Sequence, residues 1–307
     1  MPRFLPLVVA VLAFTPAARS DDALTPETLA AVKKATVFIR VEAGGWSATG
    51  SGFVVADDGK TLLIATNDHV ASARPPSGRP PTVTVVFESG TKAERSYPAQ
   101  IAASDPARDL AVLRVAGVKD PPRPIAYADT PQPVETTAVY TFGFPFGKAL
   151  AVGGGSPAVT VGKASVSSLR HGSDGELAAV QLDGSLNPGN SGGPVVDAKG
   201  RLVGVAVSRV RDGQGIGFAV PAQELDRLMR GRVGPVRVAT RKAAGGGVTV
   251  RVEADLLDPS DRLRGAVAHY LVVPSKGKAP DPAAFEKDSP HTRLELKVEK
   301  GVAAGEF

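Results

Sequence analysis

The sequence contains no cysteine, which excludes a disulfide-stapled scaffold, a thiolate metal site and a cysteine nucleophile. Its four histidines are scattered, and no two of them have the spacing of a helical metal-binding pair. Aromatic residues make up only 5% of the chain, and the net charge of +5 is not gathered in a basic tract. Nucleic-acid binding favours clustered basic and stacking aromatic residues. We therefore expect no metal, no organic cofactor and no nucleic-acid partner.

Long hydrophobic runs are also scarce. The apolar run from Phe4 to Phe14 is shorter than the roughly 20 residues that span a bilayer. Arg3 precedes this run, and Ala18-Arg19-Ser20 follows it with the small-x-small pattern of a cleavage site. We expect residues 1–20 to be a signal peptide, and the protein to be exported to the periplasm or the extracellular space without stable membrane insertion. An uncleaved anchor is the alternative.

Glycine and proline are plentiful, at 34 and 26 of the 307 residues, and they separate short segments rich in valine. This pattern favours an all-β fold of antiparallel strands joined by turns over alternating strands and helices. Helices are expected only at 24–34 and 221–230. The predicted strands are 36–42, 52–56, 62–66, 82–87, 99–103, 110–115, 137–142, 158–166, 177–182, 194–197, 202–208 and 216–220.

The composition changes near residue 233. Gly234-Pro235 and the stretch 243–247 have the composition of turns or linkers. Alternating residues beyond them predict three strands, at 248–254, 266–273 and 294–298. We expect 21–232 to be the main domain and 233–307 to be a small β-rich C-terminal region without chemistry of its own. No finishing element is evident at 305–307, so a truncated piece of a longer chain remains an alternative.

The most distinctive local motif is NPGNSGGP at 187–194. Ser191 lies between glycines, which permit backbone conformations that a Cβ would penalise. Backbone N–H groups beside a serine hydroxyl are what acyl transfer needs, because they stabilise the charge that develops on the carbonyl oxygen. Without a nearby base, a glycine-rich loop between two strands is an equally good interpretation of this motif.

A base and its orienting carboxylate are both available in the sequence. His69 lies at the exit of a buried-type strand in LLIATNDHV, and Asp109 lies where a loop enters the apolar strand at 110–115. A serine hydroxyl needs such a base, and the imidazole in turn needs a carboxylate to orient it. Asp105 competes for the carboxylate role, but its Ser-Asp-Pro context favours a turn cap.

Seven segments occur in the order that the trypsin-like serine peptidases of the HtrA/Deg type show, and the chain resembles that family over about 36–222. The segments are GSGFVV (50–55), TNDHV (66–70), DLAVLRV (109–115), GFPFG (143–147), VTVGKASVSSL (159–169), QLDGSLNPGNSGGPVVD (181–197) and GIGFAVP (215–221). The resemblance implies a chymotrypsin-like double antiparallel β-barrel. It also implies a serine endopeptidase that acts on polypeptide substrates, such as unfolded or damaged proteins.

The resemblance further implies the role of each site residue. Ser191 would be the nucleophile, His69 the general base and Asp109 its partner, with the N–H groups of Gly189 and Ser191 as the oxyanion hole. Ser208 would pair the substrate backbone. The specificity pocket would be lined by Ser185 and Leu186. Since Ser185 is not acidic, we expect cleavage after small or medium aliphatic residues.

The chain departs from the family in two places. Segment 233–307 has no recognisable PDZ pattern, and the stretch 44–49 is too short for the long loop that locks some family oligomers. A homo-oligomer therefore stays an open alternative.

Two other functions compete with the peptidase. One is a catalytically silent, peptide-binding scaffold module of the same fold. The other is an α/β-hydrolase, since GNSGG also fits a nucleophile elbow. An elbow requires a helix after the serine, whereas Pro194 and a predicted strand follow here.

Overall fold

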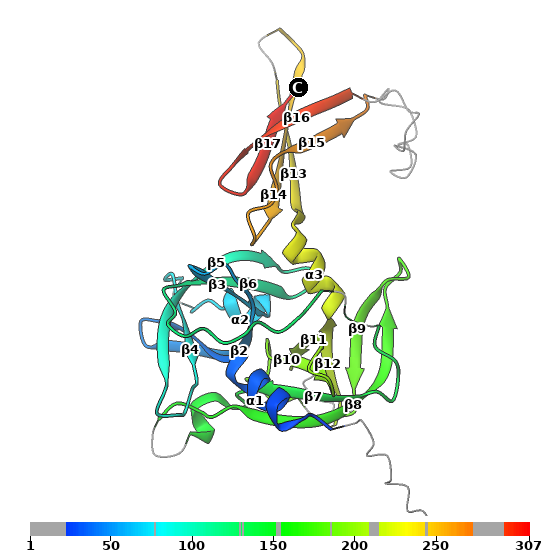
Figure 1. Cartoon of the computed structure of the whole chain (residues 1–307). Helices are drawn as coiled ribbons and strands as arrows, with labels where there is room; N and C mark the ends of the chain where they lie inside the picture. Colours follow the sequence, from blue (N-terminus) through cyan, green and yellow to red (C-terminus); the bar gives the residue numbers. More distant parts are fainter. Residues whose placement is uncertain are drawn as a thin grey trace, which may run out of the picture.

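The computed structural model of the chain describes residues 23–76, 78–128, 130, 132–151, 155–184, 186–208, 215–242, 245–272 and 292–307. Two closed six-stranded barrels lie side by side, and a five-stranded antiparallel sheet stands beyond them (Figure 1). All strand pairs in the three sheets are antiparallel. The all-β double barrel expected from the sequence is confirmed.

The first barrel has the strand order β1-β2-β3-β6-β5-β4. Alternating side chains of β1, namely Val37, Ile39 and Val41, point into it and are fully buried. Helix α1 precedes the barrel, and Thr25 caps α1 because its hydroxyl accepts the Thr28 N–H at 3.2 Å. The elements are α1 (Pro26–Ala35), β1 (Thr36–Ala43), β2 (Trp46–Asp57), β3 (Thr61–Thr66), α2 (Asp68–Ala71), β4 (Thr82–Phe87), β5 (Arg95–Asp105) and β6 (Leu110–Ala116).

The second barrel has the order β10-β11-β12-β9-β8-β7. Val139, Val180, Leu182, Val195 and Ala219 fill its interior. The elements are β7 (Ala138–Gly143), the 3₁₀ helix η1 (Gly147–Leu150), β8 (Thr160–His171), β9 (Leu177–Leu182), β10 (Pro194–Asp197), β11 (Leu202–Val207), β12 (Gly217–Pro221) and α3 (Ala222–Arg230). The predicted helices and twelve strands thus all occur, with ends shifted by a few residues.

The two barrels pack on each other through the outward faces of their strands. Phe53 and Val112 of the first barrel share one buried cluster with Phe142 and Val205 of the second and with Leu225 of α3. Strands at this interface are buried on both faces, which explains why β3 and β11 read as continuous apolar runs. The interface fixes the relative position of residues far apart in sequence.

The C-terminal region forms five strands, not the three that the sequence predicts. The sheet order is β13-β14-β17-β16-β15, made of β13 (Arg232–Lys242), β14 (Val248–Leu257), β15 (Ala266–Tyr270), β16 (Thr292–Glu299) and β17 (Val302–Glu306). Strand β13 runs through Gly234-Pro235, which we predicted to be a turn, by a register shift between Val233 and Val236. The predicted end of one strand, Val273, lies outside the described residues.

One face of this sheet is apolar and the other charged. Val236, Val238 and Val252 share the apolar face with Leu296, according to the strand registers. The opposite face carries ion pairs, such as Arg237 with Asp255 at 2.7 Å. The sheet has its own small buried cluster, formed by Ala254, Leu296 and Ala303.

No helix within the described ranges combines the length and the apolar character that a membrane crossing needs. The predicted signal peptide lies outside those ranges.

Candidate active site

His69 and Asp109 are in direct contact. His69 lies on the short helix α2 just after β3, and Asp109 ends the turn before β6. Nδ1 of His69 is 2.8 Å from Oδ2 and 2.9 Å from Oδ1 of Asp109. Because a carboxylate only accepts hydrogen bonds, this contact assigns the proton to Nδ1 and leaves Nε2 as an acceptor. The imidazole is thereby oriented to take up a proton at Nε2.

The backbone holds this pair in place. The N–H of His69 donates to Oδ1 of Asp109 at 3.0 Å, and the Nδ2 amide of Asn67 donates to the Asp109 carbonyl at 2.8 Å. Asp109 has φ +53°, a left-handed conformation that few non-glycine residues adopt. Its side chain is 16% exposed and that of His69 26%, so water reaches the pair only in part.

Ser191 lies in the turn between β9 and β10 and is 4% exposed. Of the five consecutive N–H groups from 189 to 193, three have acceptors. Asn190 donates to Asn187 O, Gly192 to Ala206 O and Gly193 to Asn190 O, at 3.0, 2.9 and 2.9 Å. In the described part of the chain, the N–H groups of Gly189 and Ser191 have no acceptor. These two are the positions that the resemblance assigns to the oxyanion hole.

The direction of the Gly189 N–H follows from the peptide bond that precedes it. The preceding carbonyl, that of Pro188, accepts the Phe146 N–H at 2.6 Å. Since a trans peptide points its C=O and N–H in opposite directions, the N–H of Gly189 is directed away from Phe146. Gly189 has φ +100°, and a Cβ there would lie 2.3 Å from Phe144 O. Glycine is therefore required at this position.

Strand β2 brings the Ser191 turn next to the segment that carries His69. The Ser51 N–H donates to the Ser191 carbonyl at 2.8 Å. A Cβ on Gly50 would lie 2.6 Å from Val70 Cγ1 and 3.3 Å from Ser191 O. A Cβ on Gly192 would lie 3.1 Å from the backbone nitrogen of Asn67, two residues before His69. The two barrels therefore place all three predicted catalytic residues in one region.

The Ser191 hydroxyl has a different partner from the one expected. Its Oγ lies 2.6 Å from the hydroxyl of Ser208 and accepts the Ser208 N–H at 3.2 Å. Within the described ranges it makes no hydrogen bond with His69. Ser208, predicted to pair the substrate backbone, follows β11 and contacts the Ser191 hydroxyl directly.

The predicted specificity pocket is described only in part. Ser185 lies outside the described residues. Leu186 is half-buried and packs against the core of the second barrel. A Cβ on Gly217 would lie 2.8 Å from Leu186 Cγ, so these two residues are in close contact.

Ser51 is a residue of the site that the sequence analysis did not identify. It is fully buried, its hydroxyl donates to Gly189 O at 2.6 Å, and it accepts the Phe144 N–H at 3.0 Å. It thus connects β2, the end of β7 and the Ser191 turn. The motif GSGFVV drew attention to this segment, but the partner of Ser51 lies 138 residues away in sequence. No local pattern reveals such a contact.

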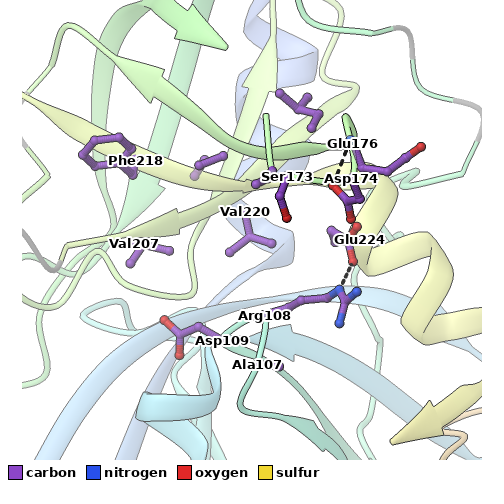
Figure 2. Close-up of a pocket in the computed structure, with 15 residues that line it drawn as sticks. Ala107, Arg108, Asp109, Ser173, Asp174, Glu176, Val207, Phe218, Val220 and Glu224 are labelled. Atoms are coloured by element: carbon purple, nitrogen blue, oxygen red, sulfur yellow. Dashed lines mark hydrogen bonds and ion pairs between the residues drawn. The ribbon is translucent and has the colours of Figure 1, made fainter. Parts of the chain in front are cut away.

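A cleft of about 530 Å³ opens beside Asp109, between the two barrels. Figure 2 shows Asp109 and Arg108 on one wall and Val207, Val220 and Phe218 on the other. Glu224 of α3 closes one end of the cleft. No group of three or more potential metal-ligating side chains occurs among the described residues.

A family model described as a trypsin-like peptidase domain matches residues 50–205, half of the chain. The chain is 31% identical over 263 residues to the serine protease PepD of Mycobacterium tuberculosis, which covers 81% of this chain and 54% of that protein. It is 28% identical over 188 residues to the Do-like serine protease HtrB of Bacillus subtilis, covering 58% and 37%. A Brucella suis protein described as a DegP-like periplasmic serine endoprotease is 33% identical over 190 residues, covering 60% and 33%.

Solved structures agree with these relatives. The crystal structure of Deg5 superposes with a TM-score of 0.52 and 25% identity, covering 66% of this chain and 90% of that one. A serine endoprotease from Yersinia pestis gives a TM-score of 0.50 and 25% identity, covering 73% of each chain. The chain spans between a third and about half of the length of the curated relatives it matches. It belongs to the trypsin-like peptidase family, and its relatives there are serine proteases of the HtrA and Deg type.

Proposed function

We propose that the chain is an exported serine endopeptidase that hydrolyses peptide bonds through Ser191, His69 and Asp109. One observation carries the proposal. Beside Ser191, the two backbone N–H groups without an acceptor are those that an oxyanion would need, and the neighbouring segment holds an imidazole already oriented by a carboxylate. A glycine-rich loop with a purely structural role has no reason to leave these two donors unused.

The reaction proceeds in two steps of acyl transfer. Ser191 Oγ leaves Ser208, passes its proton to Nε2 of His69 and bonds to the substrate carbonyl carbon, whose oxygen becomes an anion. The N–H groups of Gly189 and Ser191 stabilise that anion. Its collapse expels the amine, which takes the proton from His69. Water then gives a proton to His69, and its oxygen bonds to the acyl carbon. As the bond from that carbon to Ser191 Oγ breaks, His69 returns the proton to Oγ, and the carboxylic acid and free Ser191 are released.

We propose cleavage after small or medium aliphatic residues. Leu186 and Gly217 support this preference, because their close contact offers an apolar lining without a counter-charge for a basic side chain. Acceptable substrates are unfolded or damaged polypeptides, because an extended chain is required to reach a serine that is 4% exposed. Protein quality control in the periplasm is the role that fits such a substrate. The relative described as periplasmic supports that location, and the apolar run at 4–14 supports export.

The domain boundaries that we propose are a signal peptide at 1–20, a protease domain at 21–232 and a β-rich region at 233–307. Strand β13 begins at Arg232, which agrees with the last boundary to within one residue. A homo-oligomer is compatible with this arrangement.

The decisive test is turnover of casein by the chain from residue 21 onward, compared with Ser191→Ala. Cleavage by the first and none by the second is the expected result. Peptide substrates with Ala, Val, Lys or Glu before the scissile bond then measure the preference, and we expect Val and Ala to have the largest kcat/KM. Cleavage that persists in Ser191→Ala would overturn the assignment of the nucleophile.

A peptide-binding scaffold without catalysis is the second candidate, and the hydrogen bond between Ser191 and Ser208 favours it. A fluorophosphonate probe separates the two functions, because only an activated serine reacts with it. Stoichiometric labelling that Ser191→Ala abolishes supports the peptidase. The absence of labelling, in a protein that still binds an unfolded polypeptide, supports the scaffold.

A further inference from the structure

Five charged side chains meet near Asp109, where helix α3 passes into strand β13: Asp105, Arg108, Glu224, Arg227 and Arg232. Asp105 and Glu224 are 4% and 6% exposed, which is unusual for carboxylates. Arg232, the first residue of β13, has a side chain that is 17% exposed. Arg108 completes the group at the edge of the cleft. Buried charges persist only where they are paired, so this group is a specific feature of the fold.

The pairing is continuous from the C-terminal sheet to the first barrel. The Arg232 guanidinium forms an ion pair with Asp105 and lies 3.2 Å from Oε2 of Glu224. The same Glu224 oxygen forms an ion pair with Nε of Arg108, at 2.6 Å (Figure 2). Asp105 at the start of the turn that leads to Asp109, and Arg108 near its end, are therefore both held by ion pairs to the junction of α3 and β13.

That turn defines where Asp109 lies. Asp105 is the last residue of β5, and its carbonyl and its Oδ1 both accept the Arg108 N–H at 3.3 Å. The Asp109 N–H donates to Pro106 O at 3.4 Å, a long hydrogen bond. Asp109 itself is in the left-handed region, which aspartate enters more often than most other non-glycine residues. Contacts from outside the turn, such as that of Asn67 Nδ2 with the Asp109 carbonyl, add to what holds it there.

We propose that Arg232 and Glu224 are positioning residues for Asp109, and that through them the C-terminal sheet supports the catalytic site. This inference rests on the proposed function, in which Asp109 orients His69. Arg232 fixes the start of the turn through Asp105, and Glu224 fixes Arg108, the residue next to Asp109. The backbone of Arg232 pairs with Leu257 of β14, whose side chain is buried in the cluster between the barrels. Strand β13 cannot shift without moving this junction.

Arg232→Gln tests the proposal because it keeps a long polar side chain and removes the charge. A displaced carboxylate misaligns the base, and small misplacements remote from the chemistry cost up to about 100-fold in rate. We expect kcat to fall by about 10- to 100-fold, with KM changed by less than about twofold. Arg232→Lys keeps the charge and is expected to restore most of the activity.

Arg114→Gln is the matched control. Arg114 also connects the first barrel to the C-terminal region, since it donates to Pro259 O at 3.0 Å and to Asp261 at 2.7 Å. It lies on β6 outside the turn that leads to Asp109. We expect this variant to lose a comparable contact and to keep the wild-type kcat.

A second measurement does not need turnover. The proton on Nδ1 of His69, held by Asp109, gives a low-field proton NMR resonance. We expect Arg232→Gln to shift or broaden this resonance and Arg114→Gln to leave it in place. If the wild type has no turnover, the proposed function fails while this resonance still tests the positioning.

An unchanged resonance in Arg232→Gln, with a fall in kcat no larger than the loss of folded protein, would overturn the proposal. If Arg232→Gln does not fold, Arg108→Gln replaces it, because the Arg108 side chain is 46% exposed and is easier to change. Glu224 then loses one partner but keeps its ion pair with Arg232. The same change in the resonance, smaller in size, is expected there, and an unchanged resonance again overturns the proposal.

Discussion

Replacing Ser51 with alanine tests whether the Ser51 hydroxyl fixes the turn that contains Gly189 and Ser191. The Ser51 hydroxyl satisfies a partly buried backbone group, the Gly189 carbonyl at 2.6 Å, and a buried one, the Phe144 N–H at 3.0 Å. Alanine leaves both without a partner, and an unsatisfied buried polar group costs about 1–3 kcal/mol. We therefore expect the free energy of unfolding to fall by about 2–6 kcal/mol, in the lower half of that range if water enters the space of the missing Oγ.

The same change is expected to slow catalysis. Loss of one oxyanion donor costs roughly 100- to 1000-fold in kcat. Ser51→Ala loosens the turn that presents Gly189 without deleting its N–H, so we expect a loss of about 10- to 100-fold, measured as kcat on a peptide substrate with KM little changed.

Ser89→Ala is the matched control for this variant. Ser89 is also buried, at 4% exposure, and its hydroxyl donates to a backbone carbonyl, that of Pro157, at 2.6 Å. It should lower stability while leaving the kcat of the folded enzyme unchanged. A Ser51→Ala protein with wild-type kcat and a lowered Tm would refute the reasoning, because Ser51 would then contribute stability alone.

Three further outcomes are expected. Asp109→Asn should lower kcat by about 1000- to 10 000-fold, because an amide no longer selects the Nδ1 proton, while Tm changes little. Gly192→Ala should prevent folding of the site, since its Cβ would lie 2.1 Å from Ser51 O at φ +86°; yield and Tm measure this. Hydrogen bonding to Arg237 lowers the pKa of Asp255, so its stabilisation is complete above the unfolded pKa and is lost as pH falls through the folded one. The protection factors of β14 amides, which are exchange rates corrected for the intrinsic rate at the same pH, should therefore fall in acid.

Each of these three has a contrary result. Near-normal turnover by Asp109→Asn would remove Asp109 from the mechanism. A stable and active Gly192→Ala protein would mean that the contact with β2 is looser than the structure shows. Protection factors in β14 that are the same at neutral and acid pH would show that the ion pair of Asp255 with Arg237 contributes nothing. Exposed ion pairs are often of this kind, which makes the last test the most demanding.

The double barrel could be predicted from the sequence because its strands are short, rich in valine and bounded by glycine, proline or aspartate. His69 and Asp109 could be proposed from the sequence because each lies at the end of a strongly apolar strand, and Ser191 because glycines flank it in the motif NPGNSGGP. The structure adds what local patterns do not contain. Ser51 acts across 138 residues of sequence, and Arg232 joins a sheet beyond the barrels to the turn before Asp109.

Strands β13 and β17 were missed for physical reasons. Gly234-Pro235 has the composition of a turn, yet it lies within β13, where the register shifts between Val233 and Val236. Because β13 is an edge strand, the sheet can accommodate a proline there, although proline has no N–H to donate. The five residues of β17, Val-Ala-Ala-Gly-Glu, include a single β-branched residue. They form a strand because β14 and β16 flank them on both sides, which is tertiary context overriding a weak local preference.

The hydrogen-bond partner of the Ser191 hydroxyl decides which rearrangement the proposed catalysis requires. In the resting geometry Oγ bonds to Ser208, whereas catalysis needs it to face His69. We expect this change to be a rotation between staggered χ1 positions, which exchanges the two hydrogen bonds with Ser208 for one with His69. Such bonds contribute about 0.5–1.5 kcal/mol net, so the two states differ by an amount that substrate contacts readily supply. In the described part of the chain the Gly189 and Ser191 N–H groups have no acceptor while Oγ bonds to Ser208, and a rotation of the Ser191 side chain moves neither group. We therefore expect that the proposed oxyanion site does not have to be built during activation. This favours a peptidase at rest over a scaffold that has lost its chemistry.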